Sequence, residues 1–264
     1  MLTWNAASDI GQLRDRNEDA YDVFELPPPV GGHVFAVADG MGGQRAGDVA
    51  SRLAVQALRS HLLNWARQAA PAPPPDGVAQ ALGEAVRGAH RHLLAYVAEH
   101  PEFSGMGTTL TVLRATPTHY QYAHVGDSRL YLLRRGGLKQ LSRDHALVAD
   151  LLRSGQITEQ QARDHPQRHV LTQALGQDGE VDVDGGGGRV QVGDVLILCT
   201  DGLTSVLADD ELRAAAAEPE PEGLAERLVM LANHRGGPDN ITVITVRPND
   251  PAVAGRAAEG GGSR

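Results

Sequence analysis

The sequence predicts an α+β fold in which largely antiparallel sheets are covered by helices. Three observations lead to this prediction. Short apolar runs typical of strands come in adjacent groups, patterns typical of helices come in pairs, and the regular strand–helix alternation of a doubly wound fold is missing. The 264 residues suffice for one large domain with a sizeable core.

The predicted strands are short runs rich in Val, Ile, Leu, Thr and Tyr that are bounded by Gly, Asp or Pro. A further short strand is expected at 20–24, directly after the acidic residues Glu18 and Asp19. The six principal runs are 33–38, 108–113, 120–125, 129–133, 195–200 and 241–246.

Two long helices are expected between the first two principal strands, and a third pattern at 224–231 precedes the last strand. The run PAPPPDG at 71–77 separates the two long helices and is expected to lie outside both. Apolar residues recur at helical spacing in each: Val49, Leu53, Leu58 and Leu62 in the first, and Val78, Leu82, Val86, Leu93 and Val97 in the second.

The remaining segments predict an insert, a turn and a tail. Residues 145–175 carry two short helical patterns, and TEQQ at 158–161 matches a capping box, so we expect a small insert on the sheet scaffold. The run GGGG at 185–188 predicts a flexible turn. From residue 248 onward Pro, Ala and Gly predict a disordered tail, which leaves one domain over 1–247.

Composition excludes several function classes. The net charge of −9 provides no basic footprint for nucleic acid. The single cysteine, Cys199, rules out an internal disulfide framework and indicates a reducing compartment. The N-terminal residues lack the apolar core of a signal peptide, and no run of about 18 apolar residues could span a membrane. We therefore expect a cytoplasmic protein without nucleic-acid or membrane partners.

Carboxylates stand beside glycines at the ends of several predicted strands. Strand ends lie on sheet edges, where side chains from separate strands can converge, and a neighbouring glycine lets the backbone approach closely and offer its carbonyl oxygen. The acids in this setting are Glu18 and Asp19 before 20–24, Asp39 after 33–38, Asp127 between two strands, Asp201 after 195–200, and Asp239 before 241–246.

Several carboxylates cannot converge without a neutralising charge, because like charges repel strongly at low dielectric. Few lysines flank these acids, so a bound divalent cation is the simplest neutralising group. All the candidate ligands are oxygen donors, which favours Mg²⁺ or Mn²⁺ over zinc. A lone Asp-Gly is usually only a turn, so the pattern by itself leaves a metal site and a set of turns as alternatives.

Six motifs then occur in an order that resembles the protein phosphatase 2C family of metal-dependent serine/threonine phosphatases, in its compact bacterial form. The match runs from about residue 8 to residue 246, and six ordered motifs make it specific where any one alone would be weak. The motifs are RDRNEDAY, VADGMGGQRAGDVAS, GMGTTL, HVGDSRLYLLRRGGL, CTDGL and GGPDNITV.

The resemblance implies a four-layer αββα sandwich of two antiparallel sheets flanked by helix pairs, with two Mg²⁺ or Mn²⁺ ions at one end. It implies that the insert at 145–175 is a mobile flap beside the active site. It also implies Arg14 as the phosphate-binding arginine and Asp127, sharing Asp201, as a ligand of a third and weaker metal. The implied ligands of the central metal pair are Asp19, Asp39, the carbonyl of Gly40, Asp201 and Asp239.

The implied activity is hydrolysis of phosphoserine and phosphothreonine in phosphorylated proteins by direct attack of a metal-bridging water. Two metals roughly 4 Å apart can lower the pKa of such a water, and this reaction needs a large barrier reduction. Arg14 can donate to two phosphate oxygens at once, so Arg14 and Asp39 are the expected catalytic residues. The family also implies a monomer that reverses a bacterial serine/threonine kinase.

Two residues depart from the family pattern, and the role of Glu18 is left open. Many bacterial relatives have histidine where this chain has Gln44, which puts a proton-transfer role there in doubt. Many also have a second aspartate where this chain has Ser205, which should weaken the third metal and leave the central pair intact.

Competing interpretations concern Cys199, the pair His165 and His169, and the whole protein. A cysteine phosphatase needs arginine six residues after its cysteine, and Ser205 is there instead, so a buried structural thiol is expected. The histidines are four apart without a zincin-like partner, which favours a surface role on the flap over metal binding. The alternative functions are a phosphatase-like binding or sensing module, a phosphatase of an anti-sigma antagonist, and a metal-dependent esterase of another family.

Overall fold

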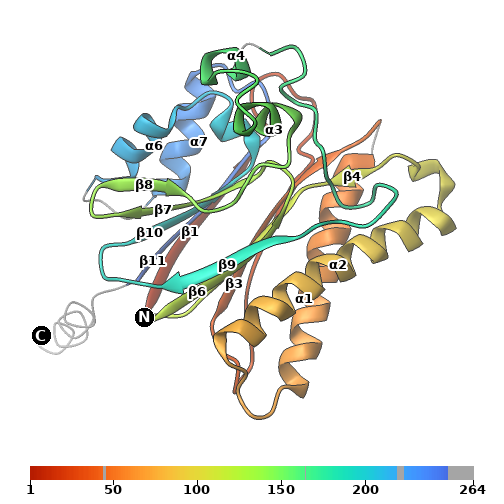
Figure 1. Ribbon diagram of the computed structural model, residues 1–264, viewed down its shortest axis with the longest axis vertical. Helices are drawn as coiled ribbons and strands as arrows, with labels where there is room; N and C mark the ends of the chain where they lie inside the picture. The colour runs from red at the N-terminus through yellow and green to blue at the C-terminus, as the bar shows by residue number, and fades with distance from the viewer. Residues whose placement is uncertain (44–45, 164, 219–222, 249–264) are drawn as a thin grey trace, which may run out of the picture.

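Two antiparallel sheets lie face to face, and helices cover the outer face of each (Figure 1). The computed structural model describes residues 1–43, 46–163, 165–218 and 223–248. This four-layer arrangement confirms the predicted αββα sandwich. Within the described residues, no helix is long and apolar enough to cross a membrane.

The first sheet contains five strands, and every neighbouring pair in it is antiparallel. The edge strands β1 and β8 were not predicted from the sequence. The spatial order is β1 (Leu2–Asp9), β11 (Ile241–Pro248), β10 (Val195–Cys199), β7 (Arg129–Arg134) and β8 (Gly137–Gln140).

The second sheet is also antiparallel throughout. The predicted strand at 108–113 is divided at Thr109, because the Thr109 N–H donates to the carbonyl of Asp39 (2.9 Å) rather than within the ladder. The order is β2 (Asp19–Glu25), β3 (His33–Met41), β5 (Leu110–Ala115), β6 (His119–Val125) and β9 (Asp184–Arg189), with β4 (Gly107–Thr108) beside β3.

The helices form two outer layers. The long helices α1 (Ala46–Gln68) and α2 (Pro75–Glu99) pack together and cover the second sheet, while α7 (Leu224–His234) packs on β1 and β11 of the first sheet. The shorter helices are α5 (Asp201–Thr204) and α6 (Asp209–Ala216) beside α7, α3 (Leu147–Arg153) and α4 (Glu159–Arg163) in the insert, and the 3₁₀ turn η1 (Pro101–Phe103).

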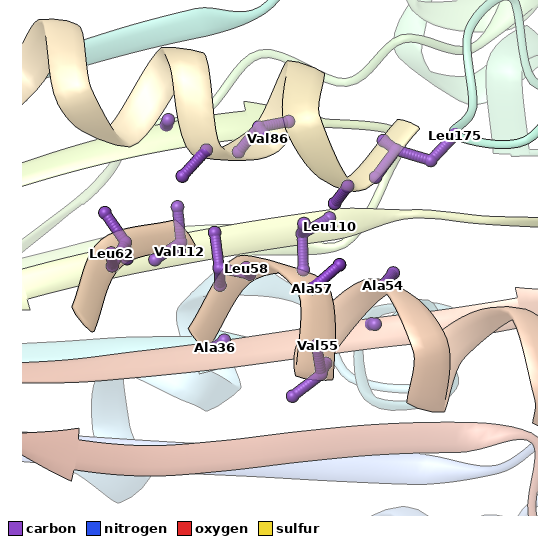
Figure 2. Close-up of a cluster of buried hydrophobic side chains, with 14 of the residues drawn as sticks. Ala36, Ala54, Val55, Ala57, Leu58, Leu62, Val86, Leu110, Val112 and Leu175 are labelled. Atoms are coloured by element: carbon purple, nitrogen blue, oxygen red, sulfur yellow. The ribbon is translucent and has the colours of Figure 1, made fainter. Parts of the chain in front are cut away.

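Apolar side chains fill all three spaces between these layers. Figure 2 shows the cluster between the long helices and the second sheet, where Leu58 of α1 and Val86 of α2 lie over Leu110 of β5. All three side chains are fully buried, and burying each contributes about 1.5–3 kcal/mol. This packing fixes which face of each sheet is buried, and the polar strand ends meet at one end of the sandwich.

The second helix starts inside the proline-rich run that was expected to lie outside it. Helix α2 begins at Pro75, so residues 75–77 are helical. Proline suits the first helical turn because its missing N–H would have no intrahelical partner there and its φ is already helical. The proline-rich run therefore contains the start of the helix.

The capping box predicted at 158–161 is present in the insert. The Thr158 N–H donates to Oε1 of Gln161 (2.8 Å), and the Gln161 N–H donates to Oγ1 of Thr158 (3.3 Å). Each side chain thus accepts from a backbone group that helix α4 leaves unpaired.

The glycine run at 185–188 is not a flexible turn, as the sequence suggested, but the middle of strand β9, paired with β6. The reason lies on the neighbouring strand. A Cβ on Gly186 would lie 2.9 Å from the ring of Tyr122, and one on Gly188 would lie 2.9 Å from the hydroxyl of Tyr120. The two tyrosines occupy the space that β9 side chains would need, so glycine is the residue that fits this strand.

Two sequence predictions fall wholly or partly outside the described residues. Gln44, expected next to the active site, is one of them. The predicted tail is another, except for Pro248, which ends β11.

We expect Gly186→Val to destabilise the protein by about 1–3 kcal/mol, because the added side chain must displace the ring of Tyr122. Urea unfolding measures this change. Gly137→Ala is the matched control, since a Cβ there meets only the Arg134 carbonyl oxygen at 3.5 Å and Gly137 also lies in a strand. Equal stability of the Gly186→Val variant and the wild type would contradict the packing role given to the tyrosines.

Candidate active site

A cavity of about 460 Å³ opens where strand ends of the two sheets meet. Its wall contains five of the six acids predicted from the sequence, together with one arginine from the N-terminal loop. The polar residues that line it include Arg14, Glu18, Asp39, Thr109, Asp127, Arg168, His169, Asp201, Ser205, Asp239 and Asn240.

Asp39 and Asp19 face each other across neighbouring strands. They are register partners in the β2–β3 pair, so their Cα atoms are about 4.5–5.5 Å apart. Like charges at directly opposed positions destabilise an antiparallel pair. The sheet therefore holds two carboxylates together against their mutual repulsion.

Asp19 lies behind the cavity wall rather than in it. Its Oδ2 accepts hydrogen bonds from Oγ1 of Thr200 (2.8 Å) and Oγ1 of Thr242 (2.6 Å). Its Oδ1 is buried and has no hydrogen-bond partner. Glu18, whose role the sequence left open, lines the cavity instead.

Asp201 is the first residue of helix α5, separated from the end of β10 by Thr200, and its Oδ1 is also buried without a hydrogen-bond partner. The next residue, Gly202, lets the chain pass close to the last strand, because a Cβ there would overlap the carbonyl oxygen of Asn240. A Cβ on Gly40 would likewise overlap the carbonyl oxygen of Gly47. Glycine at these two positions keeps the acid-bearing segments in contact.

Asp239 is paired with Arg14. The Arg14 guanidinium donates to Oδ2 of Asp239 (2.6 Å), and half of the arginine side chain remains exposed. The predicted phosphate-binding arginine therefore stands at the mouth of the cavity with donors to spare. It is held there by one of the acids.

Asp127 lies in the turn between β6 and β7 and completes the acid cluster. The neighbouring Ser128 shares a 2.8 Å hydrogen bond with Oγ1 of Thr109, which follows β4. Ser205 also lines the cavity, but it offers a neutral hydroxyl.

The protein environment opposes ionisation of these acids. Burial, followed by the charge of Asp201, raises the pKa of Asp127 to about 8. Burial raises the pKa of Asp19 to about 7, although its two threonine donors oppose the shift. Burial and neighbouring carboxylates also raise the pKa values of Asp39 and Asp201.

The donor set fits hard divalent cations that keep part of their water. Two buried carboxylate oxygens, Oδ1 of Asp19 and Oδ1 of Asp201, lack any hydrogen-bond donor. In the part of the chain that the structure describes, no three His, Cys, Asp or Glu side chains are arranged to hold an ion by themselves. Mg²⁺ usually binds through one or two carboxylates and retains several waters, so the cavity suits such an ion.

Asn240 is an important residue that the sequence did not single out. Its Oδ1 accepts from the Glu18 N–H (2.7 Å), and its Nδ2 donates to the carbonyls of Ile10 (2.9 Å) and Arg16 (2.7 Å). It thereby fixes the loop that carries Arg14 and Glu18. Its position directly after Asp239 was the available signal.

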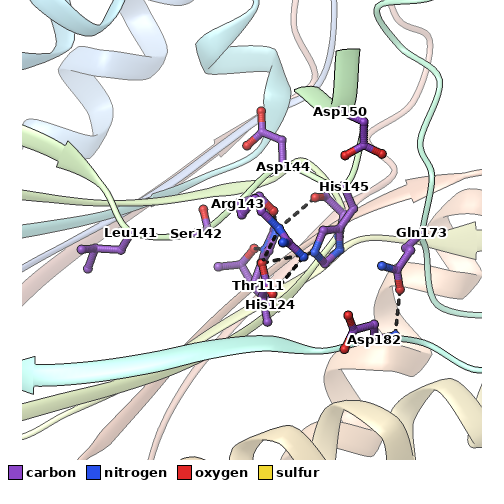
Figure 3. A network of polar contacts seen from close by, with 12 residues as sticks. Thr111, His124, Leu141, Ser142, Arg143, Asp144, His145, Asp150, Gln173 and Asp182 are labelled. Carbon is purple, nitrogen blue, oxygen red and sulfur yellow. Dashed lines mark hydrogen bonds and ion pairs between the residues drawn. The ribbon is translucent and has the colours of Figure 1, made fainter. Parts of the chain in front are cut away.

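A polar network around the buried residues Thr111, His124 and His145 lies where the insert begins (Figure 3). His124 bonds Thr111 through Nδ1 (2.8 Å), and its Nε2 lies 2.9 Å from the Gly126 carbonyl. The His145 N–H donates to the same carbonyl (2.7 Å). Burial lowers the pKa of His124 to about 3, so this imidazole stays neutral at physiological pH. The insert is thus attached next to Asp127.

The structure also places the residues that allowed competing interpretations. Cys199 is fully buried, and burial raises its thiol pKa to about 12, which confirms a structural thiol. His165 accepts the Gln167 N–H within a local turn (3.1 Å), whereas His169 and Arg168 line the cavity. The two histidines thus have different surroundings.

Comparison with known proteins now identifies the family. The family model described as protein phosphatase 2C matches residues 14–230. The chain belongs to the protein phosphatase 2C family.

Relatives in this family are bacterial phosphatases. The serine/threonine phosphatase Stp of Listeria welshimeri is 37% identical over 92% of this chain and 94% of its own length. The serine/threonine protein phosphatase PstP of Mycobacterium tuberculosis is 39% identical over 92% of this chain and 44% of its own length.

Solved structures of family members have the same fold. The S. agalactiae serine/threonine phosphatase superposes with a TM-score of 0.86 at 34% identity, covering 94% of this chain and all of the other. The PstP catalytic domain in complex with two manganese ions gives 0.78 at 35% identity, over 93% and 97% of the two chains. These similarities support a dependence of this protein phosphatase 2C family member on divalent metal ions.

We expect the metal-free protein to lose stability as pH rises from 6.5 to 8.5. Asp19 and Asp127 titrate near 7 and 8 in the folded chain, against 3.8 for an ordinary aspartate, so the folded state retains protons that the unfolded state has lost. Stability therefore falls as these protons leave. Thermal unfolding in EDTA measures how steeply stability falls with pH.

Mn²⁺ should raise the midpoint temperature of unfolding more at pH 8.5 than at pH 6.5, because the carboxylates must lose protons to bind it. Asp127→Asn should show a shallower slope in EDTA than the wild type. A slope of the same size in both proteins would contradict the assignment of a raised pKa to Asp127.

Proposed function

We propose that this protein is a metal-dependent serine/threonine protein phosphatase that hydrolyses phosphoserine and phosphothreonine in phosphorylated proteins. The convergence of Asp39, Asp201 and Asp239 on one cavity, with Arg14 at its mouth, is the observation that carries the proposal. Membership of the protein phosphatase 2C family and the names of the relatives support it.

We assign Asp39, the carbonyl of Gly40, Asp201 and Asp239 to hold two Mn²⁺ or Mg²⁺ ions. Asp19 was also expected as a ligand. Its place behind the wall and its unpartnered Oδ1 support a contribution from the rear of the site. Oxygen donors of this kind suit either cation.

Asp127, with Asp201, is assigned to a third and weaker ion. Both side chains line the same cavity, and each raises the pKa of a carboxyl there by its charge. Ser205 lines the cavity with a hydroxyl where a further carboxylate would bind more strongly, which supports weaker binding of this ion.

The chain's own residues bind and orient the phosphoryl group. A bound divalent pair supplies Lewis-acid stabilisation of phosphoryl oxygens and lowers the pKa of water. Arg14 presents a planar guanidinium with donors free to bind two phosphate oxygens. Arg168 and His169 of the insert line the same cavity and can exclude water from the bound group. Gln44 cannot titrate near neutral pH, so it does not serve as the acid that protonates the leaving alkoxide.

A kinase-linked role follows from the proposed reaction. A phosphatase of serine and threonine residues reverses serine/threonine kinases, so we place such a kinase and its substrates among the partners. We propose a cytoplasmic monomer. A phosphatase-like binding module without turnover is less well supported, because every predicted acid is present and surrounds one site.

We expect the purified protein to hydrolyse p-nitrophenyl phosphate and phosphothreonine peptides with Mn²⁺ or Mg²⁺ and to lose this activity in EDTA. Asp39→Asn should lower kcat/KM by about a thousandfold, because the metal contribution is worth several kcal/mol and 1.36 kcal/mol corresponds to tenfold. Asp22→Asn is the control, since Asp22 pairs with Arg59 away from the cavity. Activity that survives complete metal removal would rule out the proposed chemistry.

We expect Arg14→Ala to raise KM and to lower kcat/KM by about ten- to a hundredfold, which corresponds to about 1.5–3 kcal/mol of phosphate binding. Arg16→Ala removes the same charge two residues away, where the exposed side chain does not line the cavity. Steady-state kinetics of both variants test the role. The same kcat/KM in the Arg14→Ala and Arg16→Ala variants would show that Arg14 does not bind substrate.

A further inference from the structure

A second cavity, of about 510 Å³, lies at the other end of the first sheet. Turns between neighbouring strands, the end of helix α6 and the end of β11 form its wall. The charged residues in this wall are three arginines and one aspartate: Arg134, Arg135, Arg247 and Asp194.

The two cavities are separated by the length of a strand. Strand β11 begins at Ile241, next to Asp239 of the acidic cavity, and Arg247 is its seventh residue. At about 3.3 Å per residue, the strand places Arg247 about 20 Å from that cavity. A group bound here is therefore distinct from the phosphate that is hydrolysed.

The one aspartate in the wall is already neutralised. Asp194 is buried and accepts from Nε (2.8 Å) and a terminal nitrogen (2.7 Å) of Arg134, and from the Gln191 N–H (2.7 Å). Because this forked ion pair with Arg134 neutralises Asp194, the aspartate attracts the other two arginines only weakly. Two positive charges in the wall are thus uncompensated.

Arg247 is half-buried without a carboxylate. One of its terminal nitrogens donates to the Ala216 carbonyl (3.1 Å), but its Nε is buried and has no hydrogen-bond partner. Burial, followed by repulsion from Arg227, lowers its pKa. Among the described residues no Asp or Glu forms an ion pair with it. A buried donor without a partner normally destabilises the folded state.

Arg135 adds an exposed guanidinium at the rim. It occupies the two-residue turn between β7 and β8, with a φ of 51°. Residues other than glycine rarely adopt this left-handed conformation, which favours Gly, Asn or Asp in such turns. No ion pair holds its side chain within the described part of the chain.

We propose that Arg135 and Arg247 form a second oxyanion-binding site, which takes a phosphoryl or carboxylate group of a binding partner. Guanidinium groups bind the oxygens of both in the same forked geometry. In a protein of net charge −9, a pocket with two unpaired arginines is a local attraction for anions. The site binds a partner and does not take part in hydrolysis.

Titration of the full chain, freed of metal on a chelating resin and without EDTA, with inorganic phosphate and separately with citrate tests the site by NMR. We expect saturable shifts of the Arg247 Nε–H and of the Gly193 amide, which lies in the same wall. Tighter binding of phosphate assigns a phosphoryl group, and tighter binding of citrate assigns a carboxylate. No saturable shift at these two positions with either anion overturns the proposal.

Arg135→Gln and Arg247→Gln should each weaken binding at least about tenfold. Arg213→Gln, which removes an exposed charge on α6 outside the cavity, should change it less than about twofold. If the Arg247→Gln variant does not fold, the Arg135→Gln variant decides the result, because Arg135 is exposed. Unchanged affinity in the Arg135→Gln variant overturns the proposal. Since no metal or turnover is involved, either result leaves the proposed phosphatase activity to its own test.

Discussion

Repulsion among carboxylates is the constraint on which the rest of this structure depends. Burial and proximity raise the pKa values of Asp19, Asp39, Asp127 and Asp201, so the folded chain holds these acids where they resist ionisation. Only tight packing of two sheets and their helices can maintain such an arrangement. A bound cation removes the repulsion, which links metal binding to stability.

The acids are also part of what joins the two sheets. Asp19 belongs to the second sheet, yet its Oδ2 accepts from Thr242 in β11 of the first sheet. Asn240 makes a second connection by bonding the backbone of the loop before β2. The glycines that allow these approaches therefore serve the fold and the site together. Changes to the acids need separate measurements of stability and activity for this reason.

Charge is distributed unevenly between the ends of the sandwich. One end gathers carboxylates around a cavity that suits cations, and the other presents arginines around a cavity that suits anions. Strands β10 and β11 run from one end to the other. The rigid sheet thus keeps the substrate site and the proposed partner site at a fixed separation.

The sequence by itself determined the fold class, most strands and helices, and the acids of the site, because hydrophobic period and Asp-Gly turns are local signals. Only the tertiary structure decided that residues 185–188 form a strand, since Tyr120 and Tyr122 of a distant segment fill its side-chain space. It also decided that Asp19 lies behind the cavity wall while Glu18 lines it, and that Asn240 holds their loop. These outcomes depend on contacts between residues far apart in the chain, which local patterns do not contain.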